Sequence, residues 1–161
     1  MPDLLFRSDD SRYGLCLTEE CIQRILELCS RSGGRETGGV LIGHYTESLD
    51  MAVVTTATEP PPDSKSGKNW FSRGVRGLNA RLDEHWQHHQ FYLGEWHLHP
   101  RDVPDPSPTD EARMGRIANL DAYECATPVL LIVGGDPEDE WLLGAYAFPA
   151  GEQRVHLRAW K

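Results

Sequence analysis

Residues 91–100 read Phe-Tyr-Leu-Gly-Glu-Trp-His-Leu-His-Pro, and residues 107–110 read Ser-Pro-Thr-Asp. The first stretch is rich in aromatic residues, which predicts a strand over residues 91–97. The second stretch is typical of a helix start, with Ser107 as the N-cap and a proline in the first helical position. It predicts a helix over residues 108–120. A strand that leads through a polar loop into a helix is expected of an α/β fold.

The rest of the chain continues this alternation. An amphipathic helix is predicted over residues 18–32, because Ile22, Ile25, Leu26 and Cys29 recur at helical spacing. A second helix is predicted over residues 75–89, and a loop over the three-proline segment 59–69. Further strands are predicted over residues 40–45, 51–56, 128–133, 141–148 and 155–160. We therefore expect one domain over residues 1–161, a three-layer α-β-α structure around a mixed sheet.

Composition excludes several classes of protein. The chain has 161 residues, and 39% of them are hydrophobic. A chain of this size and composition can form a stable hydrophobic core without disulfides or metal ions. Its 16 basic and 25 acidic residues give a net charge of −9, which argues against nucleic-acid binding. No apolar run is long enough to span a membrane, and no secretion signal is visible. The four cysteines include no Cys-x-x-Cys pair, so we expect reduced thiols in a cytoplasmic protein.

Two histidines in the first stretch have the spacing of a metal-ligand pair. Alternate side chains of a strand share a face, so His97 and His99 point the same way. Two imidazoles at the end of a rigid strand can hold a metal ion if a third ligand arrives from elsewhere. A catalytic site would leave a fourth position for water.

Asp110 is the best candidate for that third ligand. It falls at the third position of the predicted helix, on the apolar stripe that continues through Met114 and Ile117. A carboxylate that points toward the core is costly unless it is paired or binds a metal. The alternative is that Ser107 and Asp110 form a capping box and merely begin the helix. The full spacing His-x-His-x7-Ser-x2-Asp, with proline directly after the second histidine, favours the metal interpretation.

This pattern resembles the JAB/MPN (JAMM) zinc metalloprotease family. The motif of that family is an upstream glutamate, then His-x-His, ten residues and an aspartate. The upstream glutamate matches Glu36, which precedes the run Thr-Gly-Gly-Val-Leu-Ile-Gly of residues 37–43. The resemblance covers residues 18–148 and implies the three-layer JAB/MPN fold, which is shared in outline with cytidine deaminases.

The resemblance also implies a role for each motif residue. His97, His99 and Asp110 would hold one zinc ion per chain. Glu36 would be the general base toward the attacking water, and Ser107 would stabilise the oxyanion. The chemistry is consistent, because zinc lowers the pKa of water to about 7, within reach of a carboxylate at neutral pH. The lack of side chains at positions 38 and 39 predicts either a close approach of substrate or metal, or a bulge or turn before the strand.

Other zinc classes fit less well. A zincin needs His-Glu-x-x-His, which is absent, and a nucleobase deaminase needs a Pro-Cys-x-x-Cys that the isolated Cys125 does not provide. A closed structural site would need a fourth protein ligand, and the remaining histidines offer no second pair on a strand. Three of them, at positions 85, 88 and 89, are expected on a solvated helix face.

Among family members, the chain looks most like the bacterial stand-alone branch that is encoded beside E1- and E2-like proteins. Those in CBASS anti-phage operons are thought to release a nucleotidyltransferase from its conjugated partner. The resemblance thus implies an isopeptidase whose substrate is a ubiquitin-like or C-terminally conjugated protein, with E1/E2-like proteins as partners. The alternatives are a catalytically silent MPN-type scaffold and a processing protease for a sulfur-carrier or ubiquitin-like precursor. The presence of all five motif residues argues against the silent scaffold.

Charge along the chain suggests where a partner could bind. Residues 64–82 contain five basic residues and no acidic ones, whereas residues 102–140 contain ten acidic residues and two basic ones. The basic segment could meet an acidic surface of a partner, or could simply be a solvated face. The proline-rich loop 59–69 is expected to form one wall of a substrate channel.

Overall fold

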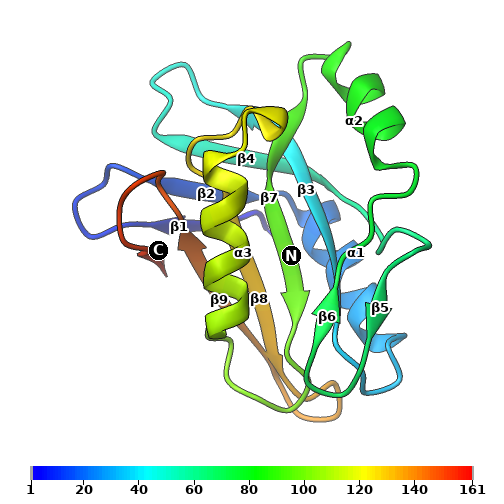
Figure 1. Ribbon diagram of the computed structural model, residues 1–161. Coiled ribbons are helices and arrows are strands. Elements are labelled where there is room, and N and C mark those ends of the chain that lie inside the picture. Colours follow the sequence, from blue (N-terminus) through cyan, green and yellow to red (C-terminus); the bar gives the residue numbers. More distant parts are fainter. Residues whose placement is uncertain (1, 161) are drawn as a thin grey trace.

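A computed structural model describes residues 2–160 of the chain. Its main sheet, shown in Figure 1, contains β1 (Leu4–Arg7), β2 (Gly14–Leu17), β3 (Thr37–Tyr45), β4 (Met51–Ala57), β7 (Phe91–Leu98), β8 (Val129–Gly135), β9 (Trp141–Ala147) and β10 (Val155–Ala159). A separate hairpin is made of β5 (Lys65–Ser66) and β6 (Phe71–Ser72). The helices are α1 (Glu19–Ser30), α2 (Leu78–Trp86), α3 (Pro108–Asn119) and the short 3₁₀ helix η1 (Asp121–Tyr123).

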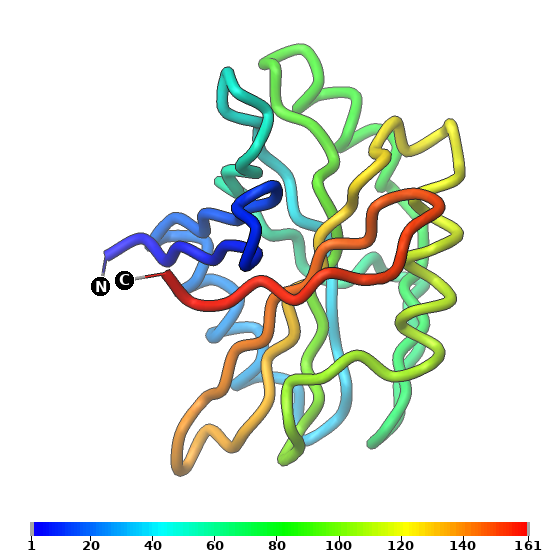
Figure 2. The backbone as a smooth tube through the Cα atoms, turned by 90° about the vertical axis from the view of Figure 1, so that its left-hand side faces the viewer, coloured from blue at the N-terminus to red at the C-terminus, as the bar shows by residue number. Residues whose placement is uncertain are grey.

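The main sheet is mixed, as predicted, but it closes on itself. Its order is β1-β10-β9-β8-β7-β3-β4-β2, with β2–β4 and β7–β8 parallel and the other neighbours antiparallel. Closure comes from β1, which pairs with β2 (Leu4 opposite Leu17) and with β10 (Phe6 opposite Ala159). Figure 2 shows the first and last strands side by side. The expected three-layer α-β-α arrangement is therefore met only in part, because the sheet closes through β1 and β2, which are too short to be predicted from periodicity.

Two of the three predicted helices have the expected start. Helix α1 is capped by Thr18, whose Oγ1 accepts a hydrogen bond from the Cys21 amide at 3.3 Å, and it buries the predicted apolar stripe. Helix α3 begins at Pro108 after Ser107, as predicted. Helix α2 is shorter than predicted and begins at Leu78. The residue before it, Gly77, has φ = 78°, a left-handed conformation that ends the preceding turn.

The predicted loop 59–69 contains part of the hairpin. Lys65 pairs with Ser72 and Ser66 with Phe71. The two strands are only two residues each, so no alternation of apolar and polar residues marks them in the sequence. The three prolines lie outside the hairpin, in irregular structure.

Strand β7 separates two parts of the core. Trp96 and Leu98 are buried on the side where α1 packs, whereas Tyr92 is buried with Met114 and Ile117 of α3 on the other side. The register between β3 and β7 shifts near Gly94, so the strand bulges there. Because side chains alternate, His97 faces away from the Trp96 side and toward α3. The helices thus lie on both faces of β7.

All four cysteines are free, as predicted. Within the described part of the chain, no helix has both the length and the apolar character that a membrane span requires.

Candidate metal centre and active site

The three predicted ligands come together where β7 ends and α3 begins. His97 is almost fully buried near the end of the strand, and His99 lies just beyond it. Asp110 is in the first turn of α3, and its Oδ1 is 3.0 Å from Nδ1 of His97 while its Oδ2 is 3.2 Å from Nε2 of His99. One ligand atom from each residue lies within 4.8 Å of the others, and these three residues could hold a metal ion.

The carboxylate of Asp110 also closes the capping box of α3. Its Oδ2 accepts a hydrogen bond from the Ser107 amide at 2.9 Å, and Oγ of Ser107 accepts one from the Asp110 amide at 3.1 Å. The two interpretations of Asp110 are therefore compatible, since one side chain begins the helix and also meets both imidazoles. The capping box fixes the carboxylate in the orientation that meets the histidines.

One atom of the cluster has no protein partner. Nε2 of His97 is buried and makes no hydrogen bond among residues 2–160. A buried polar nitrogen without a partner is costly, and such atoms are rare in folded proteins. A donor set of two imidazoles and one carboxylate is one that divalent zinc accepts. The orphaned nitrogen and the donor set together fit a bound metal ion.

Glu36 reaches this cluster because β3 and β7 are antiparallel neighbours. Thr37, the first residue of β3, pairs with Leu98 at the end of β7, which brings Glu36 beside His99. Oε1 of Glu36 is 3.9 Å from Nε2 of His99. Glu36, His99, Ser107 and Asp110 line one cleft of about 440 Å³. The structure therefore brings all five predicted site residues to one place, four in the cleft wall and His97 buried behind it.

The ionisable groups of the cluster shift one another's pKa values. Burial raises the pKa of Glu36, opposed by the attraction of His99 and reinforced by the negative charge of Asp110. Burial would lower the pKa of His99, but the hydrogen bond and charge of Asp110 and the charge of Glu36 outweigh it, so this pKa is raised. Burial also opposes ionisation of Asp110, yet the hydrogen bonds from both histidines hold its pKa well below the usual value.

The absence of a side chain at Gly38 lets His97 lie close to the backbone of β3. Gly38 lies within β3, opposite His97. A Cβ atom at this position would lie 2.7 Å from Cδ2 of His97 and 2.9 Å from Cε2 of Phe71. Phe71 in turn packs its ring edge against the His97 imidazole, with ring centroids 5.6 Å apart. The predicted close approach at this glycine is thus made by His97 and Phe71, and the predicted bulge or turn at this place is wrong.

Sequence analysis did not identify the groups that hold Phe71 and the hairpin in place. The carbonyl of Phe71 accepts a hydrogen bond from Nη2 of Arg113 on α3, at 3.0 Å. Arg73, two residues later, is buried and forms an ion pair with Glu95 of β7. The only signal in the sequence is an aromatic pair, Trp70 and Phe71, in an otherwise polar segment.

Glu95 does share a strand face with His97, yet it does not line the cleft. Its carboxylate accepts hydrogen bonds from Nε of Arg73 at 2.5 Å and from the hydroxyl of Tyr92. Arg73 also donates to the hydroxyl of Tyr123 at 2.6 Å. Glu95 is therefore committed to a buried polar network and is not placed to act in the cleft.

The cleft has two walls of different character. One wall is the β5–β6 hairpin, which contributes Lys68, Asn69, Trp70 and Phe71. The opposite wall is the loop 100–107 between β7 and α3, which contributes two aspartates and Val103. Only the last two residues of the predicted loop 59–69 line the cleft, and its prolines line a separate depression beside α2.

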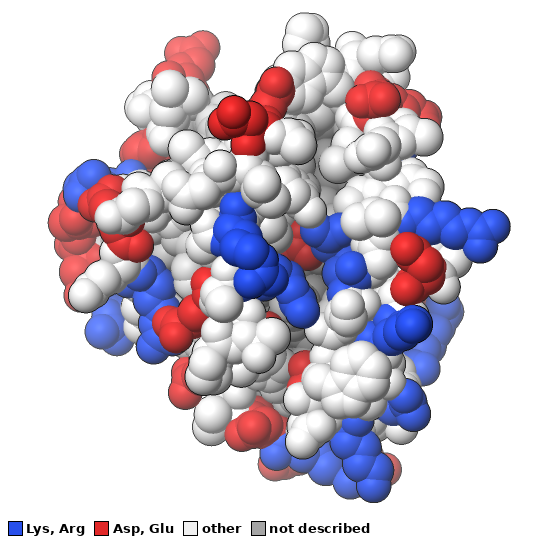
Figure 3. All heavy atoms as spheres, viewed as in Figure 1, with Lys and Arg blue, Asp and Glu red and all other residues white. Residues whose placement is uncertain are grey.

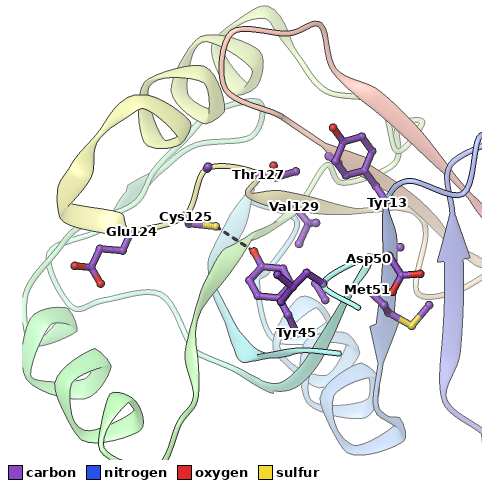
Figure 4. A pocket seen from close by; sticks show the side chains of 13 residues that line it. Tyr13, Tyr45, Asp50, Met51, Glu124, Cys125, Thr127 and Val129 are labelled. Atoms are coloured by element: carbon purple, nitrogen blue, oxygen red, sulfur yellow. Dashed lines mark hydrogen bonds between the residues drawn. The ribbon is translucent and has the colours of Figure 1, made fainter. Parts of the chain in front are cut away.

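A second cavity, of about 260 Å³, lies at the other end of β3 (Figure 4). Tyr45 and Cys125 point toward each other across it, with the hydroxyl oxygen and the sulfur 3.7 Å apart. None of the five predicted site residues lines it. It is therefore separate from the candidate active site.

The remaining histidines are dispersed. His88 and His89 are exposed as expected, but they follow the end of α2 and are not on its face. His156 stacks on Tyr146, with centroids 5.1 Å apart. Among residues 2–160, the cluster of His97, His99 and Asp110 is the one group of three such side chains placed to hold a metal ion.

Comparison with known proteins places the chain in a family. Residues 18–144 match the family described as prokaryotic homologs of the JAB domain. The CD-NTase/cGAS isopeptidase of Enterobacter hormaechei subsp. hoffmannii is 39% identical over 97% of this chain and 87% of its own length. The probable metalloprotease y4qB of Sinorhizobium fredii is 26% identical over 81% of this chain and 80% of its own.

A solved structure supports the fold. The solution structure of a protein from Desulfitobacterium hafniense superimposes with a TM-score of 0.63 over 90% of this chain and 88% of that one, at 17% identity. This likeness concerns the fold alone, whereas the family match includes Glu36 and the whole His-x-His…Asp segment. The chain belongs to the family of prokaryotic homologs of the JAB domain and is similar to bacterial relatives named CD-NTase/cGAS isopeptidase.

Proposed function

We propose that the chain is a zinc-dependent isopeptidase, which hydrolyses the amide bond after the C-terminus of a conjugated or ubiquitin-like protein. The observation that carries this proposal is the meeting of His97, His99 and Asp110 beside a cleft that Glu36 and Ser107 line. Relatives named isopeptidase and metalloprotease support the same class of reaction.

In this proposal His97, His99 and Asp110 hold one zinc ion per chain. Zinc in catalytic sites has three protein ligands, most often nitrogen or carboxylate donors, and an open fourth position. When bound, the ion would polarise the scissile carbonyl and make water more acidic. The three side chains already face one another without the ion, so little rearrangement is needed to bind it.

Glu36 is proposed as the general base and then the general acid. It would take a proton from the attacking water and pass it to the nitrogen of the leaving amine. Its half-buried position raises its pKa, which improves its ability to hold and return a proton near neutral pH. Oε1 of Glu36 lies 3.9 Å from Nε2 of His99, so its carboxylate is beside the cluster.

Ser107 is proposed to stabilise the developing oxyanion. Its Oγ accepts a hydrogen bond from the Asp110 amide, which fixes the side chain while leaving its own proton free to donate. The loss of one such donor typically costs about 3 kcal/mol of transition-state stabilisation.

The cleft suits an extended tail better than a folded surface. Phe71 packs against His97 on one side, and Gly38 has no room for added atoms beneath it. An extended tail could also add main-chain hydrogen bonds to an exposed strand of the hairpin. Small residues are therefore expected next to the scissile bond, with cleavage after a C-terminal glycine or alanine.

The substrate proposed is a conjugated CD-NTase, since that is what the names of the relatives imply for those proteins. E1/E2-like proteins would form the conjugate, and the reaction would take place in the cytoplasm, where the four free cysteines stay reduced. A processing protease for a sulfur-carrier or ubiquitin-like precursor would use the same site residues. A catalytically silent scaffold would not require these five site residues to lie together.

The experiment uses fusions that end in glycine or alanine and are joined by an amide bond to a reporter. A matched set has the last residue changed to leucine or phenylalanine, and mass spectrometry locates the cut. Selective cleavage after the small residue supports the proposal. Equal cleavage of small and bulky versions, or scattered cleavage of unfolded proteins, would indicate a general peptidase, and no cleavage with zinc present would indicate the silent scaffold.

A further inference from the structure

The two walls of the cleft carry opposite charges. On the hairpin side, Lys68 lines the cleft. Lys65 of the same hairpin, and Arg35 on the chain that leads into β3, lie just outside the lining. Across the cleft, Asp102 and Asp105 belong to the loop between β7 and α3. In Figure 3 the basic side chains gather on the hairpin side of this face, at lower right, and acidic ones lie toward the lower left, beside the start of α3.

The three cations, which we name the basic wall, have no acidic partner. Arg35, Lys65 and Lys68 are exposed, and within residues 2–160 none of them has a carboxylate oxygen within 4.0 Å. Two other basic residues of the same stretch are paired, Arg73 with Glu95 and Arg81 with Glu59. The basic stretch noted in the sequence therefore contains both paired cations and exposed cations without an acidic partner. These three charges have the sign opposite to the protein's net charge of −9.

The basic wall is held rigidly against the site. The carbonyl of Gly67, between the two lysines, accepts a hydrogen bond from the Glu36 amide at 2.8 Å, and the Gly67 amide donates to the Trp70 carbonyl at 2.9 Å. The guanidinium of Arg35 donates to the Ser66 carbonyl. Because these bonds fix the hairpin backbone before any partner binds, less conformational entropy is lost on binding.

Trp70 adds an apolar surface beside these charges. It lines the cleft and is 50% exposed, so its ring is open to contact with a bound peptide. An exposed tryptophan beside cations suits a peptide in which acidic residues alternate with apolar ones. Asp102 and Asp105 on the opposite wall would repel such a peptide, so only one wall can receive it.

We infer that the basic wall selects an acidic C-terminal tail on the protein whose carboxyl group forms the scissile amide. This inference rests on the proposed function and specifies its substrate. The tail, and not the lysine-bearing partner, is assigned to this wall because an extended main chain can follow a hairpin, whereas a single lysine side chain cannot. Complementary charge contributes mainly to the rate of association and to the choice of partner.

The test uses three fusions that share the same final glycine and reporter. Upstream of that glycine, each tail contains four test residues that alternate with alanine. The test residues are acidic in the first fusion, glutamine or asparagine in the second and lysine in the third. At low ionic strength, kcat/KM should be about tenfold higher for the acidic than for the lysine tail, as expected from a few exposed charge pairs. The difference should largely vanish at 1 M salt, where screening acts within about 3 Å.

Variants distinguish the basic wall from general charge effects. Lys65→Glu combined with Lys68→Glu should reverse the preference between acidic and lysine tails. The matched control is Arg12→Glu, which changes an exposed cation in the turn between β1 and β2 and should leave the preference unchanged. A preference that survives the double substitution, or that follows charges placed on the amine side of the bond, would overturn the inference.

Binding separates this inference from the proposed function. Fluorescent tail peptides of the three compositions are titrated into Glu36→Gln by anisotropy, which needs no cleavage. The acidic peptide should bind more tightly than the other two, and this difference should be lost when Lys65→Glu and Lys68→Glu are combined with Glu36→Gln. That result supports selection of an acidic tail by the basic wall even if no fusion is cleaved. Equal affinity for all three peptides overturns it, even if the neutral fusion is cleaved and the isopeptidase proposal stands.

Discussion

Nε of Arg73 lies 2.5 Å from Oε1 of Glu95, in an ion pair whose side chains are 5% and 0% exposed. This pair joins the end of the β5–β6 hairpin to β7, two residues before His97. The hydroxyls of Tyr92 and Tyr123 complete its hydrogen bonds. The wall of the cleft is therefore attached to the strand that carries the candidate ligands.

Breaking this pair on one side should cost more than removing it entirely. Glu95→Gln or Arg73→Met alone leaves a buried charge without its partner, and should lower the free energy of unfolding by about 3–5 kcal/mol. The double variant should lose less than the sum of the two. Urea denaturation of all four proteins measures this, and additive losses would show that the two residues do not interact.

Removal of a ligand should remove the metal. His97→Ala and Asp110→Ala are each expected to abolish near-stoichiometric zinc, measured by elemental analysis of the purified protein. His88→Ala, a change at an exposed histidine remote from the cluster, should keep it. Equal zinc in the wild type and in both ligand variants would exclude this site.

Glu36→Gln should keep the metal and the fold but lose turnover. An amide cannot accept the proton of water, so the rate of cleavage should fall by roughly 10²–10⁴-fold. Zinc content and the thermal midpoint serve as controls. If the variant retained about a tenth of the wild-type rate, outside the range for loss of a general base, another residue would be the base.

Gly38→Ala should weaken the metal site without touching a ligand. The added methyl group would lie 2.7 Å from the His97 ring, so the imidazole or the strand must move. We expect a loss of about 1–3 kcal/mol in stability and weaker zinc binding in a chelator competition. Gly115→Ala on α3 is the control, because a Cβ there meets no atom within 4 Å and helix propensity favours alanine.

Zinc affinity should begin to fall at a higher pH than an ordinary histidine predicts. A ligand histidine must be neutral, and the charges of Asp110 and Glu36 raise the pKa of His99 above 6.5 in the metal-free protein. Protons therefore compete with zinc below that raised pKa. Asp102 contributes to the same shift, and Glu36→Gln removes one of these three negative charges, so the onset should move to lower pH. An onset at or below pH 6.5 in the wild type would contradict this explanation.

The site was predictable from the sequence because its residues lie in two local patterns. His97 and His99 share a strand face, and Ser107 and Asp110 belong to one turn of a helix, so their relative positions follow from local geometry. Glu36 is distant in sequence and could be assigned only through the family motif. The alternation of strands and helices likewise predicted most of the elements.

What could not be predicted depends on contacts between distant segments. Closure of the sheet needs β1 to pair with β10, near the other end of the chain, and no local pattern encodes that pairing. The ion pair of Arg73 and Glu95 joins residues that are 22 positions apart, and no local pattern in the sequence indicated it. The strands of the hairpin are too short to show periodicity, so this wall of the cleft was the part least visible in the sequence.

The capping box of α3 has a consequence for substitutions in the loop before it. The ligands sit at the end of a strand and in the first turn of a helix, and the carboxylate of Asp110 holds those two ends together by bonding Ser107 and both histidines. In the loop between them, Asp102, Val103 and Asp105 line the cleft but are no part of the cluster. Substitutions in this loop can therefore change the surface of the cleft without moving the three side chains that could hold a metal ion.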